Sequence, residues 1–223
     1  SDGALTRLIH NRILGSINIS PDGKTLWATT SSTDRPAELA RVDLPSGRTT
    51  LLTRLAEPFM ATHALGKTRT IWFRGAHNDP VQAFVTFPPG MDFKKRYPLV
   101  FLFHGGPEGD WDGSWSGYVA NPQLLAARDL IVVKPNLHAA TSFGRAFEEA
   151  IQGQWGVVDQ QDVDACLDHL LSAYPCIDPA RIGAVGRSYG GFLVNWLNGN
   201  RPSIHTKQEK RWLFPFSQLT RNP

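Results

Sequence analysis

The pattern that most constrains this chain is a strand, a tight turn and a helix in immediate succession. Residues 181–186 predict a short apolar strand, and the apolar residues of 192–197 recur at helical spacing. Between them lies the sequence GRSYGG, which places Ser188 at the turn. A serine in this context is typical of the nucleophile elbow of an α/β serine hydrolase. The alternative is an ordinary turn serine.

The glycines around Ser188 have a steric reason to be there. A nucleophile elbow is a strained strand-to-helix turn, and side chains flanking the serine would clash. Gly186 and Gly190 supply the required spacing, and we expect Gly191 to let the following helix pack closely beneath the turn.

Two other segments are apolar at every position or nearly so. Residues 97–103 read YPLVFLF and residues 130–133 read LIVV, and each run leads into a turn or loop. Continuous apolar strands of this kind are typical of a parallel sheet that is covered on both faces. Residues 159–173 predict a helix that ends before Pro175. The predicted fold class is therefore α/β.

The run at 97–103 leads into the turn His104-Gly105-Gly106-Pro107. An oxyanion hole needs one backbone N–H from such a loop and one from the residue after the nucleophile. These donors would be Gly105 and Tyr189, each contributing on the order of 3 kcal/mol to the transition state. The alternative is that the glycines serve only the turn. Trp111 and Trp115, just after this turn, are candidates for lining a substrate pocket or for ordinary packing.

The N-terminal region has a different pattern. Residues 17–54 predict short antiparallel strands separated by turns such as Pro21-Asp22-Gly23. This resembles one blade of a β-propeller, which cannot cover its own apolar face without neighbouring blades. We predict three parts, namely a C-terminal propeller remnant at 1–68, the N-terminal part of an α/β-hydrolase domain at 69–200, and a divergent tail at 201–223.

The chain contains three strings in the order FPPGMDFKKRYPLVFLFHGGPEGDW, FGRAFEEAIQGQWG and YPCIDPARIGAVGRSYGGFLVNWL. Together they resemble the prolyl oligopeptidase family, especially its dipeptidyl peptidase and acylaminoacyl peptidase branch. The resemblance covers about residues 70–200 and implies a β-propeller joined to a C-terminal α/β-hydrolase domain that cleaves short peptides. This chain departs from the family at His104, where some members have an oxyanion-hole tyrosine, and over residues 136–144.

The acid and base of the expected triad are not evident. In this fold they follow the serine in the chain, but only one His and one Glu follow Ser188, at His205 and Glu209, in a polar stretch without an apolar strand before it. His104, His138 and His169 precede the serine. We therefore expect an incomplete triad in this chain.

The tail after residue 200 contains no Gly, Ala or Val. Two explanations are open: a truncated or frame-shifted gene product, and a divergent C-terminus. The functional alternatives are a serine peptidase acting through an acyl-enzyme at Ser188, an esterase of the same fold, and a noncatalytic product.

Composition excludes several other classes. The net charge of +3 comes from the tail, in which residues 201–223 carry five basic residues and one acidic residue, so no basic stripe for nucleic acid is predicted. No apolar run approaches the length of a membrane span. Cys166 and Cys176 have neither metal-ligand spacing nor the density of a disulfide scaffold, so we predict no metal and no cofactor.

The start of the chain gives little information on location. The first residue is Ser1 rather than Met, and the opening segment lacks the pattern of a signal peptide, so we expect the native start to be missing. A soluble protein, either cytoplasmic or exported, fits these features. The predicted partner is a short peptide substrate, and the oligomeric state stays open.

Overall fold

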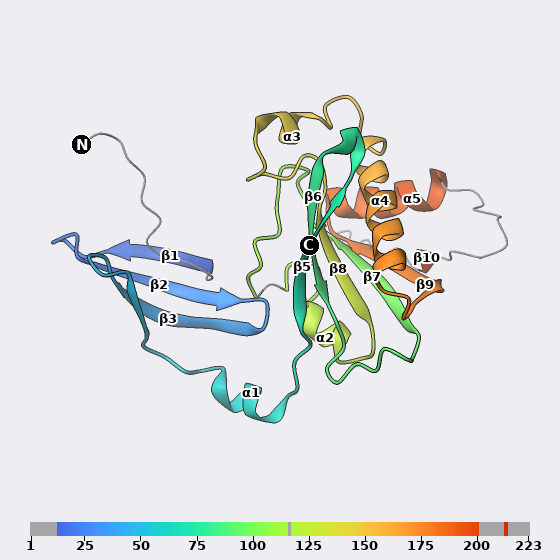
Figure 1. The fold of residues 1–223 in the computed structure, drawn as a ribbon. Helices are drawn as coiled ribbons and strands as arrows, with labels where there is room; N and C mark the ends of the chain where they lie inside the picture. The colour runs from blue at the N-terminus through green and yellow to red at the C-terminus, as the bar shows by residue number, and fades with distance from the viewer. Residues whose placement is uncertain (1–12, 116, 201–211, 214–223) are drawn as a thin grey trace, which may run out of the picture. The chain divides into compact units, whose positions relative to one another are not determined.

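A computed structural model describes residues 13–115, 117–200 and 212–213. Two compact units divide the chain between Ala64 and Leu65, close to the boundary between residues 68 and 69 that the sequence predicts (Figure 1). The first, the meander unit, runs to Ala64 and also takes in Asp112–Trp115. The second, the α/β unit, contains Leu65–Trp111 and the chain from Ser116 onward.

The meander unit is built on one antiparallel sheet in which neighbouring strands follow one another in sequence. Its strands are β1 (Ile13–Ile19), β2 (Thr25–Ser32), β3 (Arg35–Asp43) and β4 (Arg48–Leu51), followed by helix α1 (Glu57–Thr62). Gly23, in the first turn, has a φ of 68°, the left-handed conformation that glycine adopts without steric cost. Leu26, Ala28 and Val42 form a small buried cluster. Trp27, which lies between Leu26 and Ala28 in β2 and so points to the opposite face of the sheet, is 41% exposed.

A six-stranded mixed sheet forms the centre of the α/β unit, in the order β10-β9-β7-β8-β6-β5. The strands are β5 (Thr68–Arg74), β6 (Pro80–Thr86), β7 (Tyr97–Phe103), β8 (Ile131–Asn136), β9 (Ile177–Gly186) and β10 (Trp212–Leu213). The pairs of β7 with β8 and β9, and of β9 with β10, are parallel. The antiparallel pairs are β5 with β6 and β6 with β8. The apolar runs thus form the parallel strands that their composition predicts.

Both faces of this sheet are covered. Successive residues of a strand point to opposite faces, and Phe101 and Val133 belong to one buried cluster while Leu102 and Val132 belong to another. The first cluster packs against α4 (Val158–Ala173) and α5 (Tyr189–Asn200), which lie beside each other in Figure 1. The second packs against α2 (Pro122–Ala126) and Trp111.

Local chemistry explains the start of α2 and the end of α4. Asn121 caps α2, since its side chain accepts a hydrogen bond of 2.9 Å from the Gln123 N–H, and Pro122 is the first residue of that helix. Helix α4 ends at Ala173, two residues before Pro175. Two short helices, η1 (Ala76–Asn78) and α3 (Arg145–Glu149), lie in connecting segments.

The predicted tail at 201–223 lies outside the described residues except for β10. Trp212 and Leu213 pair in parallel with Ile182 and Gly183 of β9. His205 and Glu209, the candidates for base and acid after Ser188, are not among the described residues.

Candidate active site

Ser188 lies at a sharp turn between β9, which ends at Gly186, and α5, which begins at Tyr189. Its φ is 56°, a left-handed conformation that is uncommon and strained for a residue with a side chain. The turn is held by a 3.0 Å hydrogen bond from the Gly190 N–H to the Arg187 carbonyl. The backbone at Ser188 therefore has the strain that a nucleophile elbow requires.

The two glycines flanking the elbow are needed because of close backbone approach. A Cβ added to Gly186 would lie 2.1 Å from the carbonyl oxygen of Gly190, and one added to Gly190 would lie 2.3 Å from that of Phe103. No side chain fits at either position. Gly191 was expected to allow close packing of the helix beneath the turn. This expectation is wrong, because a Cβ on Gly191 would lie at an ordinary contact distance of 3.5 Å from the carbonyl oxygen of Gly186.

The predicted glycine turn lies directly beside the serine. A Cβ added to Gly105 would be 2.8 Å from Cβ of Ser188 and 2.7 Å from Oη of Tyr118. Tyr189 is the first residue of α5, so its backbone N–H has no acceptor within the helix and is available to a ligand. The structure brings both predicted oxyanion donors next to Ser188, and their catalytic role stays a prediction. Sequence reasoning missed Tyr118, whose ring lies 4.8 Å from the Arg187 guanidinium carbon.

The two tryptophans after the glycine turn differ in their surroundings. Trp111 is only 5% exposed, with the Lys134 ammonium 4.8 Å from its ring and both its backbone N–H and carbonyl bonded to the Asn136 side chain. Its burial in the core argues against the proposed substrate contact. Trp115 is half-buried in the meander unit and makes an edge contact with Phe59. For Trp115 the substrate role remains a prediction.

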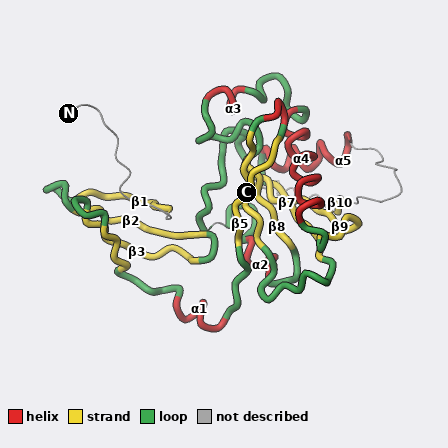
Figure 2. The backbone as a smooth tube through the Cα atoms, in the orientation of Figure 1, coloured by secondary structure: helices red, strands yellow, loops and turns green. Residues whose placement is uncertain are grey.

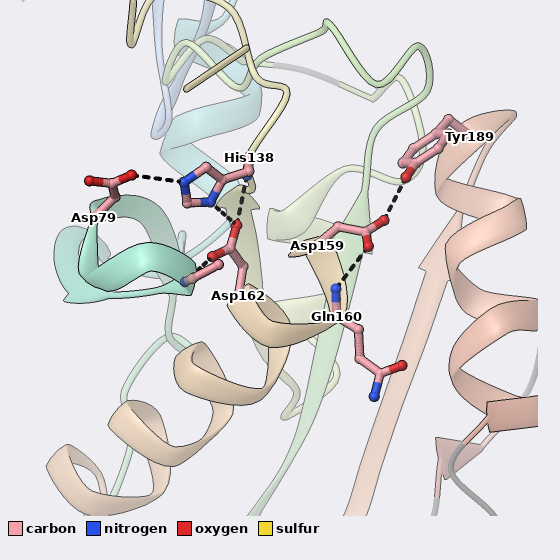
Figure 3. Close-up of polar contacts among 7 residues, drawn as sticks. Asp79, His138, Asp159, Gln160, Asp162 and Tyr189 are labelled. Atoms are coloured by element: carbon pink, nitrogen blue, oxygen red, sulfur yellow. Dashed lines mark hydrogen bonds and ion pairs between the residues drawn. The ribbon is translucent and has the colours of Figure 1, made fainter. Parts of the chain in front are cut away.

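The residue after the serine carries a further polar contact that the sequence did not reveal. The Tyr189 hydroxyl donates a 2.5 Å hydrogen bond to Oδ2 of Asp159 (Figure 3). Asp159 is fully buried, and burial raises the pKa of its carboxyl group. Burial also raises the pKa of Tyr189, so that the phenol stays protonated. Both side chains line a small pocket together with His104, His138 and Leu193.

Three of the histidines that precede Ser188 in the chain, His104, His138 and His169, each have structural partners. Both ring nitrogens of His138 face carboxylates, with Nδ1 2.8 Å from Asp162 and Nε2 3.3 Å from Asp79 (Figure 3). Burial lowers the pKa of His104, whose ring packs edge-on against Trp111. His169 is half-buried beside Phe73. That none of them is the catalytic base stays a prediction.

Within the described residues, no group of three or more His, Cys, Asp or Glu side chains is arranged to hold a metal ion. In the same part of the chain, no helix is long and apolar enough to cross a membrane. Cys166 and Cys176 are both buried free thiols, and burial raises the pKa of each.

Sequence comparison relates the chain to known peptidases. Residues 115–206 match the model of the prolyl oligopeptidase family. A probable dipeptidyl-peptidase 5 of Aspergillus clavatus is 41% identical over 130 residues, covering 58% of this chain and 18% of that protein. The dipeptidyl-peptidase 5 of Schizosaccharomyces pombe is 30% identical over 191 residues, covering 84% of this chain and 26% of that protein. The chain thus spans about a fifth to a quarter of the length of these curated relatives.

Solved structures show the same fold. An acylaminoacyl peptidase in complex with Z-Gly-Gly-Phe-chloromethyl ketone superposes with a TM-score of 0.78 at 23% identity. The match covers 88% of this chain and 30% of the solved one. The α/β unit therefore has an α/β-hydrolase fold.

Proposed function

Because the chain belongs to the prolyl oligopeptidase family of peptidases, we propose that Ser188 is the nucleophile of a serine peptidase that hydrolyses short peptides. The observation that carries the proposal is the left-handed backbone of Ser188 at the strand-to-helix turn, with Gly105 directly beside it. The serine oxygen attacks the peptide carbonyl carbon, and its hydroxyl proton is passed to the amine that leaves. Water then hydrolyses the acyl-enzyme, which releases the carboxylic acid and restores the serine hydroxyl. Gly105 and Tyr189 donate their N–H groups to the oxyanion.

Dipeptidyl peptidase activity is the favoured form, supported by the relatives named dipeptidyl-peptidase 5. We further propose that the meander unit is one blade of a β-propeller. Its four strands follow one another in an antiparallel sheet, and the large apolar side chains Ile17, Ile19 and Trp27 are exposed on it. Neighbouring blades would cover such side chains.

One observation favours a noncatalytic alternative for this chain. The described residues after Ser188, which are 189–200 and 212–213, contain no His, Asp or Glu. A serine hydroxyl without a base is a weak nucleophile. A test of Ser188 as a nucleophile therefore includes an added general base.

We expect a fluorophosphonate probe to label Ser188, and added imidazole to accelerate labelling at least about tenfold by acting as an external general base. The serine oxygen bonds to phosphorus, fluoride leaves, and imidazole takes the hydroxyl proton. Mass spectrometry locates the adduct, and Ser188→Ala is the control that should remain unlabelled. A folded chain that stays unlabelled with imidazole would support the noncatalytic alternative.

Substrate class is tested under the same conditions. A peptidase should turn over a dipeptidyl amide, whereas an esterase of the same fold should act only on a short acyl ester. Rates for the two substrates, each measured against Ser188→Ala, separate these alternatives.

The glycine turn offers a second test of the proposal. A Cβ at Gly105 would lie 2.8 Å from Cβ of Ser188, so Gly105→Ala is expected to push the loop and its N–H away from the nucleophile. We expect the imidazole-assisted labelling rate to fall about 100-fold, as when one oxyanion donor is removed. The chain between β7 and α2 is drawn largely as loop in Figure 2. Gly117→Ala, in this connecting segment, is the control because a Cβ there meets nothing within 4 Å. Equal rates for the two variants would contradict the assignment of Gly105.

A further inference from the structure

The side chain of the residue after Ser188 is fixed at its far end. Tyr189 Oη donates to Oδ2 of Asp159 at 2.5 Å, and the Trp155 ring packs edge-on against the tyrosine ring at 5.0 Å. Asp159 is fully buried, so water does not compete for its oxygens. The tyrosine ring is thus held both by a short hydrogen bond and by packing.

The carboxylate that holds Tyr189 is itself anchored. Asp159 is the second residue of the 16-residue helix α4, and its Oδ1 accepts a 2.9 Å hydrogen bond from the Gln160 N–H. Backbone N–H groups in a first helical turn lack intrahelical acceptors and favour a negative charge. The contact therefore ties Tyr189 to a long helix packed on the sheet rather than to a loop.

This contact has a consequence for the backbone at the elbow. The Tyr189 N–H belongs to the peptide bond that follows Ser188, whose φ of 56° is strained for a residue with a side chain. Stabilisation of an oxyanion depends on donors that are oriented before the reaction. Holding the tyrosine side chain restrains its Cα and, with it, the direction of the adjacent N–H.

We propose that Asp159 is a positioning residue: by binding the Tyr189 hydroxyl, it orients the Tyr189 N–H toward the oxyanion formed at Ser188. The proposal rests on the function proposed above. It predicts that loss of the contact slows the chemical step without weakening binding of the reagent.

A second hydrogen bond between α4 and α5 provides a matched control. Trp196 Nε1 donates to Oε1 of Gln160 at 3.0 Å, next to the Asp159 contact but without involving Tyr189. Gln160→Met removes this tie and preserves the length of the side chain. A purely structural role for Asp159 predicts similar effects of the two changes.

The test is fluorophosphonate labelling of Ser188 in the presence of imidazole, with the maximal rate and the half-saturating probe concentration measured separately. We expect Asp159→Leu, which has no acceptor for the Tyr189 hydroxyl, and Tyr189→Phe each to lower the maximal rate about tenfold or more, as small misplacements of catalytic groups do. The half-saturating concentration should not change. The double variant should be no slower than the slower single variant, because both changes break one contact.

The outcomes are distinguishable. A wild-type maximal rate in Asp159→Leu, or an equal loss in Gln160→Met, would overturn the positioning role while leaving Ser188 as the nucleophile. An original chain that is not labelled at Ser188 at all would overturn the proposed function, and the positioning role with it.

Discussion

Replacing Gly190 with alanine is expected to lower the free energy of unfolding of the α/β unit by at least about 3 kcal/mol, the upper range for forcing extra atoms into a packed site. The added Cβ would lie 2.3 Å from the Phe103 carbonyl oxygen and 2.6 Å from that of His104. Both oxygens belong to the backbone at the end of the central strand β7, so neither can rotate away as a side chain could. The elbow and the strand would have to separate. Denaturant unfolding followed by circular dichroism measures the loss.

The neighbouring glycine provides the control. Gly191 is also in α5, but a Cβ there would lie 3.5 Å from its nearest neighbour, Gly186. Since alanine is about 0.8–1.0 kcal/mol better than glycine inside a helix, Gly191→Ala should keep or raise stability and should leave labelling of Ser188 intact. If both variants unfold like the original chain, the close approach at Gly190 does not constrain the elbow.

The contrast between these glycines shows what the sequence can and cannot predict. Apolar composition predicted the central strands because a strand buried on both faces needs apolar residues throughout, and residues 97–103 match β7 to the residue. The Gly-x-Ser-x-Gly spacing predicted the elbow for a similarly strong steric reason. Gly191 was misjudged because sequence spacing does not report which neighbour a Cβ would meet.

The polar contacts inside the α/β unit could not be predicted from the sequence in the way that the central strands and the elbow could. Asp159 and Asp162 are fully buried in α4, although acidic residues usually lie on a solvated helix face. Their burial could have been predicted, since Asp159 lies four residues before Val163 and Asp162 four residues before Cys166, both on the apolar stripe. Their partners, Tyr189 and His138, lie 30 and 24 residues away in the chain, and only the folded sheet brings them together.

Replacing His138 with leucine is the second change expected to have a large effect. Asp162 accepts hydrogen bonds from the backbone N–H of Ala76 at 2.8 Å and of His138 at 2.7 Å, and its Oδ2 lies 2.8 Å from His138 Nδ1. The histidine ring is fully buried and stacks on Phe147 at 4.0 Å. Leucine would remove the ring that partners Asp162 and leave a buried carboxylate without it, which costs about 3–5 kcal/mol of stability.

Two further variants test whether charge causes that loss. Asp79 reaches His138 Nε2 at 3.3 Å but has a half-exposed side chain, so Asp79→Asn should cost about 1 kcal/mol or less. Combining His138→Leu with Asp162→Asn removes both charges, so we expect the double variant to be more stable than His138→Leu alone. A double variant less stable than the single one would mean that shape rather than charge dominates the site.

The charge on His138 also makes stability depend on pH in a defined direction. Burial alone would lower the pKa of His138, but its hydrogen bonds and the charges of Asp162 and Asp79 outweigh burial and raise the pKa. A histidine with a raised folded-state pKa stabilises fully below its unfolded pKa of about 6.5, and this contribution is lost as pH rises through the folded-state value. The free energy of unfolding of the original chain should therefore decrease as pH is raised from about 6.5 through that value. This decrease should be smaller in His138→Leu, and an identical pH dependence in the two proteins would show that His138 is not charged in the folded state.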